Sequence, residues 1–203
     1  MLTASIGSKA VAIAAGLSLG GVISLGAGPL TDLERQRLAA HLEMTAGWLA
    51  DEVSGLSAAQ LEFRPAAEAW TILQVLEHLV VVRSIYWDDL QKAMKASPGT
   101  RVSSMTDADI LWYGIDRMAR EKAIAPEEPP GKLRDLGRGL EAYRKLYPQL
   151  LRYITTTQDD LRSRIVDRQG CDAYQWALLI STHEQRHILQ IRDIKADAKF
   201  PAK

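Results

Sequence analysis

Apolar side chains recur at intervals of three and four residues along four long stretches of this 203-residue chain. That spacing places them on one face of an α-helix, so each stretch is expected to fold as an amphipathic helix. No run of alternating apolar and polar residues is long enough to build a sheet, and the sequence therefore predicts an all-α fold. The four predicted helices span residues 32–56, 71–95, 132–155 and 172–197.

Several helix ends carry their own sequence signals. Thr31 and Glu34 form a capping box at the start of the first helix, and Thr71 is placed to cap the second. Pro148 interrupts the third helix. Because proline deprives the carbonyl four residues earlier of its hydrogen bond, we expect a kink near Arg144.

The connection between the second and third helices is long. Residues 106–122 predict a shorter amphipathic helix within it, and a proline-rich stretch follows at 126–131. A connection of this length can cross a helix bundle, so the helices need not alternate in direction. We therefore predict a four-helix bundle over residues 30–197, with a long crossover connection between helices two and three and a tail at 198–203.

The first 28 residues differ from the rest of the chain. Lys9 is the only charged residue before Asp32, and residues 10–27 are small or aliphatic with a few serines. A basic residue, an apolar run and small residues near its end are typical of a secretory signal peptide. The run also reaches the length of an uncleaved membrane anchor. We expect an exported protein, periplasmic or extracellular, or one tethered to a membrane by residues 10–27. If the segment is neither a signal peptide nor an anchor, the protein is expected to be cytoplasmic.

Composition excludes two classes of function. The chain carries 25 basic and 25 acidic residues, so no basic surface for nucleic acid is expected. Cys171 is the single cysteine, which excludes an internal disulfide, and no histidine or aspartate pattern marks it as a nucleophile.

Two histidines in the last predicted helix indicate a metal site. His183 and His187 lie four residues apart, on the same helix face as the apolar side chains of Trp176 and Ile191. Imidazoles on a buried face need a polar partner, and a divalent ion can use both at once. Neutral imidazole nitrogens bind borderline ions such as zinc or nickel.

His78 is the third candidate ligand. It lies in an apolar segment of the second predicted helix, and a bundle would direct it into the same interior. Three histidine ligands leave coordination positions open for water or a small-molecule substrate, which distinguishes catalytic metal sites from structural ones. Gln190, three residues beyond His187, is expected to hydrogen-bond to a ligand imidazole.

Glu184 is the candidate catalytic base. It follows His183 directly, so residues 183–187 match the His-Glu-x-x-His pattern of zinc proteases, in which the glutamate is the general base. It lies about 100° round the helix from His183, however, which also fits a solvated residue or one that supports the ligands. Two hypotheses without catalysis stay open as well: a metal-binding or stress-response module, and a helical interaction domain whose histidines only pack.

Two segments of the chain together resemble the DinB-like superfamily of four-helix metalloproteins. They are the Trp-Thr-Ile of residues 70–72 with the Glu-His-Leu of residues 77–79, and residues 183–191; the likeness extends over residues 33–195. The resemblance implies a four-helix bundle and a divalent ion, often zinc or nickel. It also implies the ligands of that ion, which fall on His78, His183 and His187.

The superfamily also implies classes of reaction. Members include bacillithiol S-transferases, mycothiol-dependent maleylpyruvate isomerases and proteins classed as metal-dependent hydrolases. The resemblance therefore implies a metal-dependent hydrolase or thiol S-transferase that acts on a small molecule. Bacillithiol and mycothiol are cytosolic, so export would favour hydrolysis. A monomer and a homodimer are both open.

Overall fold

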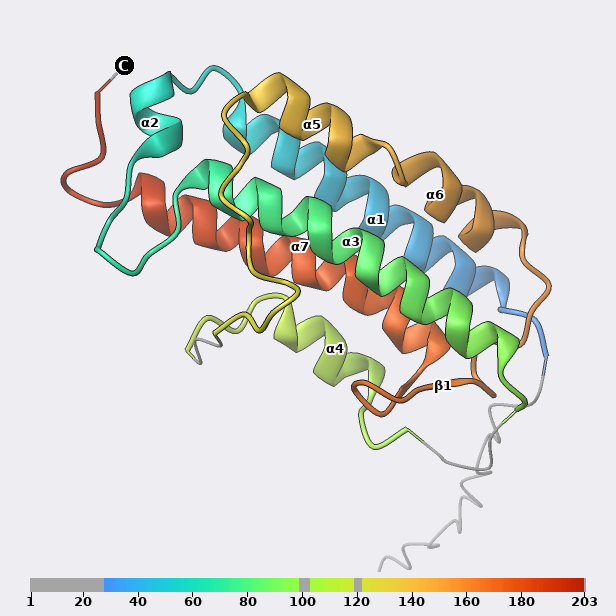
Figure 1. Ribbon diagram of the computed structural model, residues 1–203. Coiled ribbons are helices and arrows are strands. Elements are labelled where there is room, and N and C mark those ends of the chain that lie inside the picture. The colour runs from blue at the N-terminus through green and yellow to red at the C-terminus, as the bar shows by residue number, and fades with distance from the viewer. Residues whose placement is uncertain (1–27, 99–102, 119–121, 203) are drawn as a thin grey trace, which may run out of the picture.

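Four long helical stretches pack side by side in the computed structural model, which describes residues 28–98, 103–118 and 122–202 (Figure 1). Three stretches are single helices, and the fourth consists of two consecutive helices, α5 and α6. The long helices are α1 (Asp32–Val53), α3 (Ile72–Lys95), α5 (Leu136–Arg144), α6 (Tyr147–Thr156) and α7 (Ala173–Lys195). The all-α prediction is thereby confirmed.

Short elements lie at the ends and on one side of the bundle. α2 (Ala58–Glu62) precedes α3, and α4 (Asp107–Tyr113) packs along α7. β1 (Ile165–Val166) and β2 (Cys171–Asp172) form a small antiparallel hairpin that leads into α7. No helix among the described residues combines the length and the apolar character needed to span a bilayer. The apolar run predicted at residues 10–27 lies outside the described residues.

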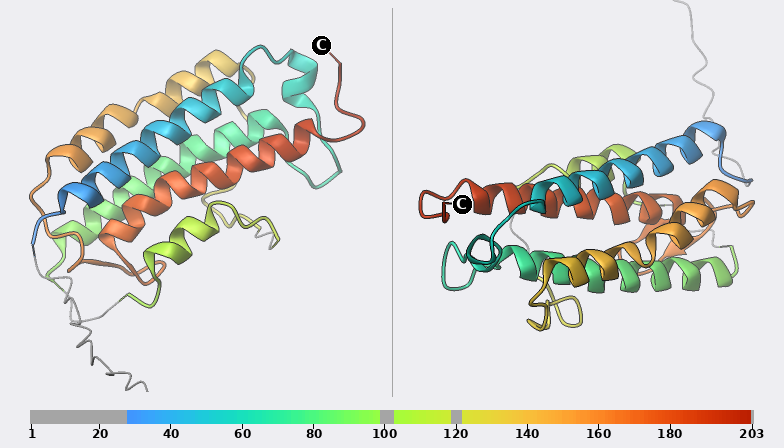
Figure 2. Two further views of the ribbon diagram at one scale, coloured as in Figure 1. Left: turned by 180° about the vertical axis from the view of Figure 1, so that it is seen from behind. Right: turned by 90° about the horizontal axis from the view of Figure 1, so that it is seen from above.

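The bundle contains the crossover that the long connection predicts. α1 and α7 run in one direction, whereas α3 and the α5–α6 pair run in the other (Figure 1). Because α3 and α5 are parallel, the chain between them returns along the length of the bundle and forms α4 on the way. Figure 2 shows the same arrangement from two further sides.

Helix ends follow the local signals closely in α1, α3 and α7. Thr31, Thr71 and Asp172 each accept a hydrogen bond from the third backbone N–H of the helix they begin, and each completes a capping box. α1 ends at Val53 rather than at residue 56, because Gly55 adopts a left-handed conformation with φ of 67° that cannot continue a helix.

Two boundaries in the second half of the bundle differ from the predictions. The third helical stretch begins at Leu136, not at residue 132, because the Asp135 side chain caps it. It breaks between Arg144 and Tyr147, as Pro148 predicts. The short helix predicted over residues 106–122 ends at Tyr113, where the chain turns.

α7 is the central element of the core. It contacts α1, α3, α4 and the hairpin, so side chains on nearly every side of it are buried. The Trp176 indole, fully buried, donates a hydrogen bond of 2.8 Å to the backbone carbonyl of Tyr86 on α3. Polar residues of α7 are therefore enclosed as well, including His183 and Glu184.

Two helical glycines are expected to respond oppositely to alanine. At Gly47, on the exposed side of α1, an added Cβ meets nothing within 4 Å, so Gly47→Ala should raise the free energy of unfolding by about 0.5–1 kcal/mol. At Gly139 an added Cβ would lie 2.6 Å from Leu76 Cδ2 and 2.7 Å from Leu133 Cδ2. Gly139→Ala should therefore cost about 1–3 kcal/mol through overpacking. Urea unfolding of both variants measures the difference, and equal stabilisation by both would contradict the close packing of α5 on α3.

Candidate metal centre

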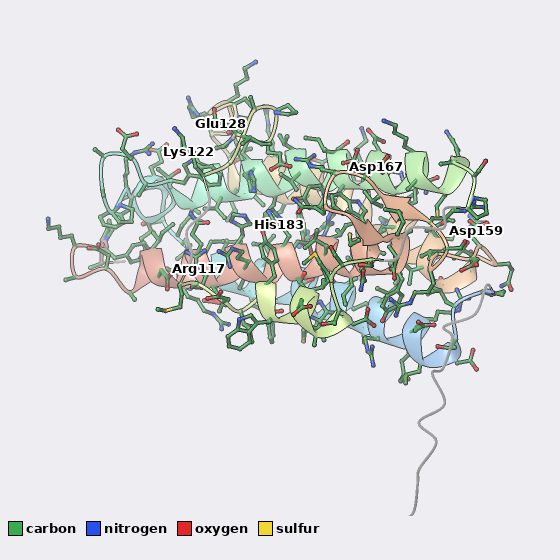
Figure 3. The ribbon with its side chains drawn as sticks, turned by 90° about the horizontal axis from the view of Figure 1, so that it is seen from below. Arg117, Lys122, Glu128, Asp159, Asp167 and His183 are labelled. Atoms are coloured by element: carbon green, nitrogen blue, oxygen red, sulfur yellow. The ribbon has the colours of Figure 1, made fainter. Side chains whose placement is uncertain are left out.

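Three imidazoles converge in the space between α3 and α7. His78 comes from α3, and His183 and His187 come from successive turns of α7. Their Nε2 atoms lie 3.4 Å apart for His78 and His183, 3.1 Å for His78 and His187, and 3.2 Å for His183 and His187. His78 and His183 are only 2% and 5% exposed, whereas His187 is partly exposed. Figure 3 shows His183 in this position between the two helices.

The spacing of the three nitrogens fits a tetrahedral divalent ion. Zinc binds imidazole nitrogen at about 2.0–2.1 Å, so two such ligands at a tetrahedral angle are roughly 3.3–3.4 Å apart. The observed separations are close to that value. Of the described residues, these three form the group whose donor atoms could hold an ion, all within 4.8 Å of one another.

Hydrogen bonds at the opposite side of two rings set their tautomers. His78 Nδ1 lies 2.6 Å from the backbone carbonyl of Glu127, which can only accept, so Nδ1 carries the proton. His187 Nδ1 lies 2.7 Å from Oε1 of Gln190, as the sequence position of Gln190 predicts. Each Nε2 therefore presents a lone pair to the centre, which is the form that binds a metal.

Burial keeps the three imidazoles neutral. It lowers the pKa of His78, lowers that of His183 well below its usual value, and lowers the pKa of His187 to about 3. Repulsion from the neighbouring histidines lowers the pKa of His183 and of His187 further. Neutral rings whose lone pairs face one another repel, and a bound cation converts that repulsion into attraction. The donor set thus fits a divalent ion.

Aromatic side chains surround the three rings. The Trp70 ring lies 4.8 Å from that of His78 and 6.2 Å from that of His187, measured between centroids. Tyr113, the last residue of α4, stacks on His183 at 6.4 Å, and Tyr86 of α3 lies 5.4 Å from the same ring. These rings limit the access of water from the sides and strengthen electrostatic interactions at the centre.

Glu184, the predicted base, belongs to a different cluster. Its side chain is 2% exposed and forms an ion pair with Arg83 of α3, whose Nε lies 2.8 Å from Glu184 Oε1. Thr45 of α1 donates a further hydrogen bond of 3.0 Å to Oε2. The structure thus brings the three predicted ligands together and directs Glu184 toward α1 and α3. Proton transfer by Glu184 stays a prediction.

One partner of the centre, the backbone carbonyl of Glu127, was not predictable from the sequence. This residue lies in the long connection, 49 positions from His78. A carbonyl carries no side-chain signature, and only the path of the loop brings it to the imidazole. The proline-rich composition of that loop was the sole local signal of an irregular, ordered structure there.

Comparison with known proteins gives one family. A sequence profile described as DinB superfamily matches residues 30–191. A Bacillus subtilis (strain 168) protein named "Uncharacterized protein YuaE" is 28% identical over 151 residues, which cover 71% of this chain and 89% of that protein. No solved structure matches the chain.

Glu184→Gln should destabilise the protein. The change leaves the Arg83 guanidinium buried without a counter-charge, which typically costs about 3–5 kcal/mol. Replacing both Arg83 and Glu184 with methionine should recover much of that loss, since no buried charge is then left. Urea unfolding measures both. Glu52→Gln, which weakens a partly exposed cluster with Arg192 and Lys195, is the control and should cost under about 1 kcal/mol. Wild-type stability in Glu184→Gln would contradict this role.

Proposed function

The chain belongs to the DinB superfamily, and on that premise we propose that it is a divalent-metal-dependent enzyme that transforms a small molecule by hydrolysis or group transfer. The observation that carries the proposal is the convergence of three neutral Nε2 atoms at tetrahedral spacing. Three ligands leave a coordination position open for a substrate or water.

Each residue of the centre has a defined task in this proposal. His78, His183 and His187 hold the ion. A bound zinc or nickel ion would supply Lewis acidity, which polarises the reacting bond and brings the pKa of a coordinated water toward about 7. The Glu127 carbonyl and Gln190 fix the orientation of two of the imidazoles, and the rings of Trp70, Tyr86 and Tyr113 exclude bulk water.

Hydrolysis of a small ester or amide is the first reaction to test. It needs only water as the second reactant, whereas transfer to bacillithiol or mycothiol needs a cytosolic thiol. The predicted export of the chain therefore favours hydrolysis. A protease is disfavoured, because the third ligand comes from a separate helix, α3, and Glu184 is ion-paired to Arg83.

Metal analysis of the purified full-length chain tests the centre. About one equivalent of a transition metal is expected, with loss of that metal in His78→Ala, His183→Ala and His187→Ala. His41→Ala is the matched control: His41 hydrogen-bonds Ser181 at 2.8 Å, outside the cluster, so this variant should retain the metal. Removal of the metal with a chelator should also lower the melting temperature, because an ion that binds only the folded state stabilises it.

Turnover tests the reaction itself. The metal-loaded chain is expected to act on members of a panel of small esters, amides and thiol conjugates, and the folded His183→Ala variant is expected to lose that activity. A chain that holds one equivalent of metal but turns over none of the panel would favour the metal-binding module. A folded chain that refuses added zinc and nickel would leave the histidines as packing residues.

A further inference from the structure

We propose that Glu77 is a positioning residue of the metal centre, which acts on His78 through the loop of residues 127–133. The inference rests on the proposed metal site and adds to it a residue that touches neither metal nor substrate. Glu77 and His78 are consecutive on α3, yet their side chains hold two different points of the same loop.

The Glu77 carboxylate binds three successive backbone N–H groups. Gly131 donates to Oε2 at 2.7 Å, and Lys132 and Leu133 donate to Oε1 at 2.8 and 2.9 Å. Glu77 is buried, so these charge-assisted bonds are poorly replaced by water. Three consecutive N–H groups converge on one anion only in a specific turn, and Gly131 adopts the positive φ of 68° at this point.

The other end of the loop contacts His78 directly. The Glu127 carbonyl accepts a hydrogen bond from His78 Nδ1, which directs Nε2 toward His183 and His187. The Glu127 side chain forms an ion pair with Arg168 of the β1–β2 hairpin. The carbonyl that orients the ligand is thus held on one side by the hairpin and on the other by the residues that Glu77 binds.

These contacts attach the loop of residues 127–133 to α3 at two points. Glu77 of α3 binds the loop at residues 131–133, and His78 of α3 binds it at the Glu127 carbonyl. The position of that carbonyl relative to the imidazole is therefore fixed by both contacts. Partners that orient ligand imidazoles typically change metal affinity by about 10–100-fold when they are lost. A change at Glu77 that disturbs the loop should therefore lower the metal affinity, although Glu77 is not a ligand.

The test compares one variant that changes charge with one that does not. Glu77→Gln replaces an acceptor oxygen with an amide NH₂ group, which cannot accept the hydrogen bond from the Gly131 N–H. Gly131→Ala disfavours the left-handed turn without altering any charge. At Gly131 an added Cβ meets nothing within 4 Å, so the backbone conformation alone is affected. Both variants should bind Co(II) roughly 10-fold or more weakly than wild type and alter its visible spectrum.

Two matched controls separate positioning from a loss of stability. Glu34→Gln removes another capping carboxylate, which is partly buried and binds Thr31 and Arg162, and Gly55→Ala strains another glycine with a φ of 67°. Neither contacts the loop or the histidines in the described hydrogen bonds. Each should lower the urea midpoint while leaving the Co(II) affinity and spectrum unchanged.

The outcomes are distinct. Co(II) affinity and spectrum equal to wild type in folded Glu77→Gln and Gly131→Ala would overturn the positioning role and leave the metal site intact. A wild-type chain that binds no Co(II) would overturn the metal site, and this inference with it. If Glu77→Gln fails to fold, Gly131→Ala decides the question.

Discussion

Burial of α7 on nearly all sides obliges each polar side chain that it carries to find a partner inside the bundle. Unpaired buried polar groups cost free energy, and unpaired buried charges cost more. Glu184 meets this requirement through Arg83 and Thr45, and Arg186 donates to the backbone carbonyl of Tyr113. His183 has no such hydrogen-bonding carboxylate among its described contacts and instead faces two other imidazoles. This cluster of three histidines is thus the part of the buried face of α7 whose donor atoms could hold a metal ion.

The sequence predicts the parts of the structure that local physics decides. Capping residues mark the starts of α1 and α3, and Pro148 breaks the third stretch where the backbone loses a hydrogen bond. The end of α4 at Tyr113 was not predictable, because the helical pattern continues beyond it and the chain turns to place the Tyr113 ring on His183. The late start of α5 also depends on a tertiary contact, since the N–H groups of residues 131–133 converge on Glu77 of α3 in a turn where Gly131 has a non-helical φ of 68°.

The acidic residues directly adjacent to the clustered histidines have different roles on different helices. Glu184 follows His183 and Glu77 precedes His78, and in sequence either could be taken for a proton carrier. Helical geometry turns both away from the centre: Glu184 toward α1 and α3, and Glu77 toward the long connection. The three histidines were predictable because a single helix face and a bundle suffice to bring them together. The role of their neighbours depends on tertiary contacts that no local pattern encodes.

The origin of the ligands on α3 and α7 also bears on how the protein folds. His78 and His183 are separated by 105 positions, so their approach requires the closure of about half of the 203-residue chain. Closing so long a segment is entropically costly and comes only when native packing compensates for it. All three histidines can bind an ion only after α3 and α7 have docked. A bound ion would therefore slow the unfolding of the finished bundle more than it speeds its assembly.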